Sequence, residues 1–142
     1  MAKLLRPDIN TKIHIDYDWW AEHSRNVRVL IWEQLCPECK DKFGTDTDTG
    51  DIDWVDPDTG EITMVDGLTY SLRECCSRRE DYITSTTPVA ASIFRVFIAN
   101  GNTPLSAAEL HDKIGRSDAL SILRVLLGRQ MRTHYGIRPI LE

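Results

Sequence analysis

The sequence contains no apolar run long enough to cross a membrane. Its two most apolar stretches, residues 27–32 and 120–127, each contain an arginine. Residues 1–7 have no apolar segment of the kind that forms the centre of a signal peptide. We therefore expect a cytoplasmic protein that does not associate with membranes. With 142 residues, the chain can form one domain or two small ones.

Sequence motifs that are typical of enzyme active sites are also absent. The chain has no glycine-rich phosphate loop and no dinucleotide-binding fingerprint. None of its four histidines stands beside a serine or cysteine in a recognisable nucleophile motif. These absences favour a protein that is not an enzyme.

Charge is unevenly distributed along the chain. Residues 1–86 carry 10 basic and 18 acidic side chains, whereas residues 87–142 carry 7 basic and 4 acidic ones. Eight carboxylates fall between Asp46 and Asp66 without a single lysine or arginine. An acidic front half repels nucleic acid, and the mildly basic rear half tolerates it. The distribution predicts a protein partner, with nucleic acid as a weak second possibility.

Cysteine is scarce, but its placement is informative. The chain has only four cysteines, arranged as Cys36-Pro37-Glu38-Cys39 and Cys75-Cys76. In a cytoplasmic protein such pairs indicate metal or redox chemistry rather than structural disulfides. Four thiolates fill a tetrahedral shell and leave no position for a substrate. The spacing therefore predicts a structural zinc site formed by Cys36, Cys39, Cys75 and Cys76.

Two points about this site stay open at the level of sequence. Adjacent cysteines can bind one metal only where the backbone is bent, so His23 or a carboxylate is an alternative fourth ligand. Pro37 disfavours a helical conformation at Cys36 and should end the preceding helix there. Pro37 can equally start a new helical turn with Cys36 as its N-cap, which keeps a dithiol oxidoreductase as an alternative.

The front half predicts a strand, a long helix and a hairpin. Residues 11–15 are typical of a short strand, and Asp16 or Asp18 can cap a helix that runs to about Leu35. Residues 51–65 alternate around the turn residues 56–60, which indicates a β-hairpin. Residues 36–76 thus resemble a zinc ribbon, in which a hairpin lies between two metal-binding knuckles. The unspaced Cys75-Cys76 pair departs from the usual zinc-ribbon pattern.

The rear half predicts three helices and a terminal strand. Thr87-Pro88 starts a helix that ends near Ala99, and Ser106 with Glu109 forms a capping box for a second helix to Ile114. Ser117 is expected to cap a third helix to about Leu127, and a strand follows within residues 135–140.

Residues 88–140 resemble a winged-helix domain. This resemblance implies that the third helix presents Arg116 and Arg124 to a partner, with further basic charge nearby from Arg129, Arg132 and Arg138. In members that bind DNA, the third helix enters the major groove. Winged helices also serve as protein-interaction modules, and the small number of basic residues here suits that use.

The sequence therefore predicts an α+β protein with two regions. Residues 1–86 would form a long N-terminal helix with a zinc-ribbon-like hairpin insertion, and residues 87–142 a winged-helix-like domain of three helices. The predicted function is a non-enzymatic, zinc-stabilised interaction or regulatory module in a cytoplasmic complex. The alternatives are a winged-helix DNA-binding regulator and a dithiol oxidoreductase.

Overall fold

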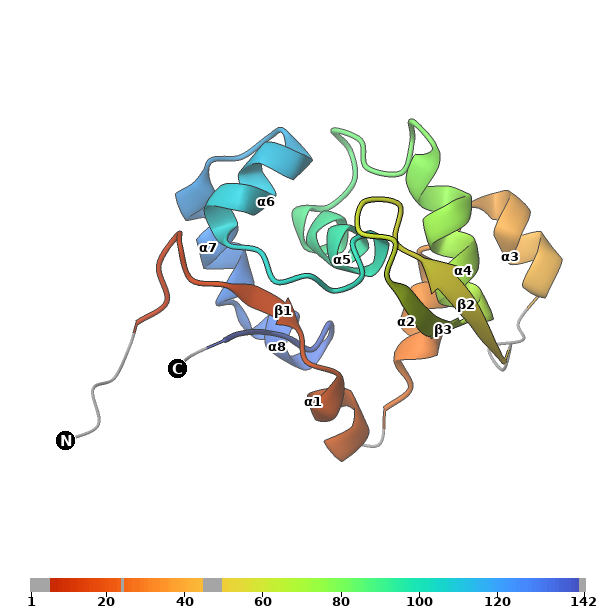
Figure 1. Cartoon of the computed structure of the whole chain (residues 1–142). Coiled ribbons are helices and arrows are strands. Elements are labelled where there is room, and N and C mark those ends of the chain that lie inside the picture. The colour runs from red at the N-terminus through yellow and green to blue at the C-terminus, as the bar shows by residue number, and fades with distance from the viewer. Residues whose placement is uncertain (1–5, 24, 45–49, 141–142) are drawn as a thin grey trace. The chain divides into compact units, whose positions relative to one another are not determined.

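The structure is a computed structural model that describes residues 6–23, 25–44 and 50–140. Within these ranges it contains eight α-helices and four strands, and the strands form two separate antiparallel pairs. Figure 1 labels these elements along the chain. The predicted α+β class is therefore confirmed.

The chain divides into two compact units. One unit is Asn26–Tyr82, and the other combines Met1–Arg25 with Ile83–Glu142. Our predicted division at residues 86 and 87 differs from this, because it placed the N-terminal segment in the front region. The segment joins the rear unit because strand β1 (Ile13–Ile15) pairs with strand β4 (Ile137–Pro139).

The unit Asn26–Tyr82 is built from short elements. Helices α2 (Val27–Glu33) and α3 (Pro37–Phe43) precede the hairpin, and helix α4 (Gly67–Glu74) and a 3₁₀ helix, η1 (Cys76–Arg78), follow it. Few large apolar side chains of this unit are buried. They are Leu30, Ile31, Leu35, Trp54, Leu68 and Leu72.

The hairpin lies where the sequence predicted it. Strands β2 (Asp51–Val55) and β3 (Ile62–Asp66) pair with Val55 opposite Ile62. In the turn, the Asp56 carboxylate accepts hydrogen bonds from the backbone N–H groups of Asp58 and Thr59. Gly60 has φ +74°, a left-handed conformation that glycine adopts without steric cost.

The predicted long N-terminal helix is wrong. Helix α1 covers only Tyr17–Glu22 and ends at its C-cap His23, and α2 begins separately after Asn26. Asn26 has an extended backbone, and its side chain accepts a hydrogen bond from the N–H of Arg28, which makes it an N-cap. This local cap starts a new helix, so the apolar periodicity on either side belongs to two helices in different units.

The second unit contains the larger core. Its helices are α1, α5 (Val89–Ala99), α6 (Ala107–Ile114), α7 (Ala119–Leu126) and α8 (Arg129–Thr133). Strand β1 pairs with β4, and Ile13 also exchanges two backbone hydrogen bonds with Leu105. Its nearly inaccessible side chains include Ile13, Ile15, Ile93, Phe94, Phe97, Ile98, Leu110, Ile122 and Leu126.

Most of the predicted rear elements are present, with two differences. The capping box of Ser106 and Glu109 is formed. The N-cap of α7 is Asp118 rather than Ser117, because Ser117 takes a left-handed conformation (φ +61°) and the Asp118 carboxylate accepts from the N–H of Ser121. Helix α8 was not predicted. The terminal strand, Ile137–Pro139, lies within the predicted segment. The winged-helix resemblance stays a prediction.

Gly136 has a position that only glycine tolerates. Its φ is +63°, and a Cβ atom there would lie 2.5 Å from Nε1 of Trp20 and 2.8 Å from Cε3 of Trp19. Nε1 of Trp20 also donates a hydrogen bond to the carbonyl of Tyr135 (3.1 Å). We expect Gly136→Ala to lower the free energy of unfolding by roughly 2–4 kcal/mol, from left-handed strain plus overpacking. Chemical denaturation measures this loss.

Gly115→Ala is the matched control. Gly115 is also left-handed (φ +77°), but nothing lies within 4 Å of the Cβ position. It should therefore lose only about 1 kcal/mol, from backbone strain alone. Equal losses for the two variants would contradict the packing of the tryptophans around Gly136.

Candidate metal centre

Helix α3 carries the first pair of cysteines. Cys36 is the N-cap with an extended backbone (φ −67°, ψ 160°), and Pro37 occupies the first helical turn. Because Cys39 follows Cys36 by three residues, both side chains lie on the same side of this turn. Of the two roles that the sequence left open for Pro37, the structure shows the start of a new helix.

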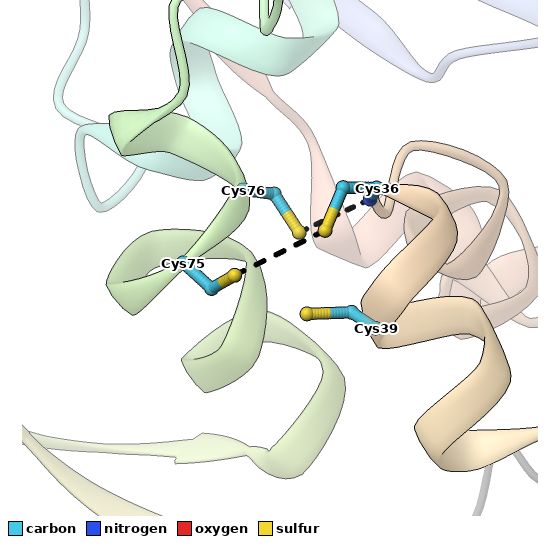
Figure 2. Close-up of side chains that lie close together, drawn as sticks. All are labelled: Cys36, Cys39, Cys75 and Cys76. Carbon is cyan, nitrogen blue, oxygen red and sulfur yellow. Dashed lines mark hydrogen bonds between the residues drawn. The ribbon is translucent and has the colours of Figure 1, made fainter.

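The second pair lies where α4 ends and η1 begins. Cys75 is the C-cap of α4, and its backbone (φ −121°, ψ −67°) leaves the helical conformation immediately before η1 starts at Cys76. In an unbroken helix, adjacent side chains point about 100° apart. Figure 2 shows that both sulfur atoms instead point toward those of Cys36 and Cys39. The bent backbone that adjacent ligands require is therefore present.

The four sulfur atoms have the spacing of a single-ion site. All four lie within 4.8 Å of one another, and those of Cys36 and Cys75 are 3.9 Å apart. A tetrahedral zinc ion with Zn–S bonds of about 2.3 Å places its sulfurs about 3.8 Å apart. All four cysteines are free thiols rather than disulfides. The residues thus fit one tetrahedrally coordinated metal ion.

The surroundings of the cluster suit negatively charged sulfur. Cys36, Cys39 and Cys76 are buried, and Cys75 is half-buried. The backbone N–H of Cys36 donates to the sulfur of Cys76 (3.1 Å). Such N–H···S contacts orient thiolate ligands and stabilise their charge. The fold therefore supplies a donor to the cluster as well as the ligands.

The thiols lie close together and are largely buried, and as a result their pKa values differ from one another. Burial raises the pKa of Cys36, but hydrogen bonds from the backbone N–H of Cys39 and from the other three thiols outweigh it and lower the pKa to about 7. Burial and the hydrogen bonds within the cluster raise the pKa of Cys39 well above its usual range. Burial also raises the pKa of Cys76 to about 11. One thiol thus loses its proton easily, while its neighbours stay protonated. A bound cation would stabilise the charge of all four thiolates.

Sequence reasoning missed Arg79, which lies three residues beyond Cys76. Its backbone N–H donates to the carbonyl of Cys76 (3.2 Å). The pKa of its guanidinium is raised first by the hydrogen bond to Asp81, and further by the charges of Cys36 and Cys75. Arg79 thus places positive charge near the thiolates. The pattern Cys-Cys-x-x-Arg is the only sequence signal for it.

His23, the alternative fourth ligand, has other contacts. Its Nδ1 lies 2.9 Å from the carbonyl oxygen of Trp19, and its ring stacks on the Trp19 ring at 4.5 Å. Among the described residues, the four cysteines form the one group of potential ligands close enough to hold a metal. The geometry favours both Cys75 and Cys76 over a substitute ligand.

The five arginines proposed to contact a partner have different surroundings. The guanidinium of Arg116 donates to the carbonyl of Ser85, and two of its nitrogens are buried without a hydrogen-bond partner in the described structure. Arg132 and Arg138 line a surface cavity of about 390 Å³, and Arg138 lies 3.9 Å from the Asp16 carboxylate. Arg124 and Arg129 are exposed on α7 and α8.

Comparisons with known proteins add no further constraint. Neither the family models nor the curated proteins nor the solved structures contain a match to this chain. Within the described ranges, no helix combines the length and apolar character needed to cross a bilayer. Functional inference therefore rests on the geometry of the cysteine cluster.

The geometry predicts that Cys75 and Cys76 contribute equally to metal binding. Cys75→Ser and Cys76→Ser should each weaken zinc binding at least about 100-fold, because loss of even an outer-shell partner costs 10–100-fold. Competition with a chromophoric zinc chelator measures the affinity. Ser77→Ala is the control, since the Ser77 hydroxyl donates to the carbonyl of Arg73 rather than to sulfur. Normal affinity in either cysteine variant would mean that the fourth ligand lies elsewhere.

Proposed function

We propose that this protein is a non-enzymatic interaction module whose unit Asn26–Tyr82 is stabilised by a structural zinc ion. The observation that carries the proposal is the convergence of four free cysteine sulfurs within 4.8 Å of one another. Two cysteines come from the start of α3 and two from the junction of α4 and η1. One ion bound here would connect helices on both sides of the hairpin.

A structural role follows from the number of ligands. Four thiolates complete the tetrahedral shell of zinc, whereas catalytic zinc sites keep one position open for water or substrate. The unit also needs such a connection, because α3 has only seven residues. Isolated helices of this length are not stable in water. The ion would therefore contribute to folding rather than to a reaction.

The donor set and its spacing suit a zinc ion better than an iron–sulfur cluster. An all-thiolate tetrahedral site is typical of zinc or of iron–sulfur clusters. In a four-iron cluster each cysteine binds a different iron atom, so the sulfurs are separated by the width of the cluster. The compact spacing in this structure suits a single ion.

A protein partner is better supported than DNA. The winged-helix resemblance assigns Arg116 to a DNA-contacting position, but its guanidinium is bonded to the carbonyl of Ser85 and partly buried. Asp118, the N-cap of α7, adds a carboxylate two residues beyond Arg116. DNA affinity depends on free cationic groups that neutralise phosphates. Few such groups are available on α7.

Protein purified without added metal should contain one zinc ion per chain by elemental analysis. Removing it with a strong chelator should lower the free energy of unfolding by about 4 kcal/mol or more, since structural zinc binding typically supplies about 10–16 kcal/mol. Binding requires the thiols to lose protons, so zinc affinity and stability should both fall as the pH is lowered. The proposal would be contradicted if the chain is fully folded without metal and its melting temperature is the same with and without the chelator.

One observation favours a second candidate, a dithiol oxidoreductase. Cys36 caps the N-terminus of α3, and its pKa is lowered to about 7, as in sites where a reactive thiolate attacks a disulfide. Cys39 would then act as the resolving thiol. The presence of two further cysteines at the same point is explained by metal binding and is not required by this chemistry.

Alkylation rates separate the two candidates. With structural zinc, iodoacetamide should label all four cysteines slowly at neutral pH, and labelling should accelerate after chelation, because the metal occupies the thiolate lone pairs. Mass spectrometry of peptides locates the label. Rapid labelling of Cys36 alone, unchanged by chelator, is the result expected of an oxidoreductase and would reject the structural role.

A further inference from the structure

The β2–β3 hairpin has two different faces. In its register Val55 pairs with Ile62 and Asp53 with Met64, so these four side chains share one face. Trp54 lies between Asp53 and Val55 on the same strand, so its side chain is on the opposite face of the hairpin. It is 8% exposed, and the guanidinium of Arg73 on α4 lies 4.6 Å from the centre of its ring. The hairpin therefore packs on α4 through the Trp54 face, and we call the other side its outer face.

The outer face exposes apolar side chains. Val55 is 54% exposed, Ile62 63% and Met64 68%, the last two being the most exposed large apolar residues in the described structure. Val55 and Ile62 are direct cross-strand neighbours, and Met64 follows on the same strand. Single exposed apolar residues are ordinary, but three adjacent ones on one face indicate a contact surface.

The same residues of β3 present an unpaired backbone edge. The bonds from Asp56 N–H to the Glu61 carbonyl and from Gly67 N–H to the Gly50 carbonyl mark the hydrogen-bonded positions at the two ends of the ladder. Antiparallel pairing alternates, so Ile62 and Met64 occupy non-hydrogen-bonded positions and direct their backbone groups away from β2. Among the described residues, no further strand pairs with β3.

The charged side chains of the hairpin itself are all acidic, and one of them, Asp66, lies 4.0 Å from Arg28 of α2. Residues 50–66 contain six carboxylates and no lysine or arginine. Asp51, Asp53 and Glu61 are exposed. This negative charge repels nucleic acid and a second copy of the same acidic hairpin. It attracts a basic segment.

We propose that the outer face and the β3 edge bind an extended basic segment of a partner protein, which adds to the hairpin as a third strand. Backbone hydrogen bonds to Ile62 and Met64 would supply affinity. Apolar side chains of the segment would cover Val55, Ile62 and Met64, and its lysines or arginines would be attracted by the overall negative charge of the hairpin. The inference rests on the proposed function, because it specifies the partner of the zinc-stabilised unit.

Fluorescence anisotropy with the zinc-loaded 142-residue chain tests the proposal. The probe is a labelled decapeptide of alternating lysine and valine, and the comparison peptide alternates glutamate and valine. Saturable binding of the Lys–Val peptide that weakens with salt, together with no binding of the Glu–Val peptide, is expected. Absence of Lys–Val binding, or equal binding of both peptides, would overturn the proposal.

Three substitutions of Met64 separate side-chain from backbone contributions. Met64→Lys should weaken binding at least about tenfold by replacing an apolar contact with a like charge. Met64→Pro should also weaken binding relative to Met64→Ala, since it removes an N–H that points away from β2 and leaves the β2–β3 ladder intact. Val29→Lys is the matched control, because Val29 is 49% exposed on α2 of the same unit. Binding that Val29→Lys weakens as much as Met64→Lys would contradict this location.

Two further measurements distinguish the other outcomes. Zinc content is determined for every variant. If the zinc-loaded chain does not bind the peptide, the docking surface is rejected and the proposed function is unaffected. If a folded, zinc-free chain binds the peptide, the proposed function is rejected and the docking surface is unaffected. Sedimentation across protein concentrations tests self-association. A dimer that is lost in Met64→Lys would identify a second copy as the occupant and overturn the proposal.

Discussion

The convergence of four thiols on one point is the constraint on which the unit Asn26–Tyr82 depends. Sulfurs within 4.8 Å of one another cannot all carry negative charge in a largely buried site unless a cation is present. Protonated, they would form only weak hydrogen bonds with one another. A bound divalent ion converts this crowding into four bonds, which is why a structural metal accounts for the arrangement better than four ordinary buried thiols do.

The two units differ in how much apolar core they possess. The unit that contains α5 buries Phe94, Phe97 and several isoleucines and leucines, so ordinary packing holds it together. The unit Asn26–Tyr82 has short helices and a two-stranded hairpin, and its buried apolar residues are few. Small units of this kind are commonly stabilised by metal ions or disulfides. The proposed division of roles follows: the metal maintains a small unit, and that unit presents an exposed acidic hairpin.

Much of the local structure was predictable because its signals are carried by neighbouring residues. The turn from Asp56 to Gly60, the capping box of Ser106 and Glu109, and the pairing of the cysteines all act over a few positions. Errors arose where two local signals compete. Apolar periodicity predicted one helix through residues 16–35, and the cap at Asn26 divides it. Serine is a common N-cap residue, but Ser117 has a left-handed backbone, and the N-cap of α7 is Asp118 instead.

By itself, the sequence determined the α+β class, the hairpin, the three rear helices α5, α6 and α7, and the four candidate ligands, because composition, turn residues and cysteine spacing act locally. Tertiary structure decided how distant segments meet. It paired β1 with β4, which moved the N-terminal segment into the rear unit, and it directed the Arg116 guanidinium to the carbonyl of Ser85. It also brought Cys75 and Cys76 together with Cys36 and Cys39. That last arrangement requires the backbone to leave the helical conformation at Cys75, between α4 and η1, and the residue types of an adjacent cysteine pair do not reveal such a bend.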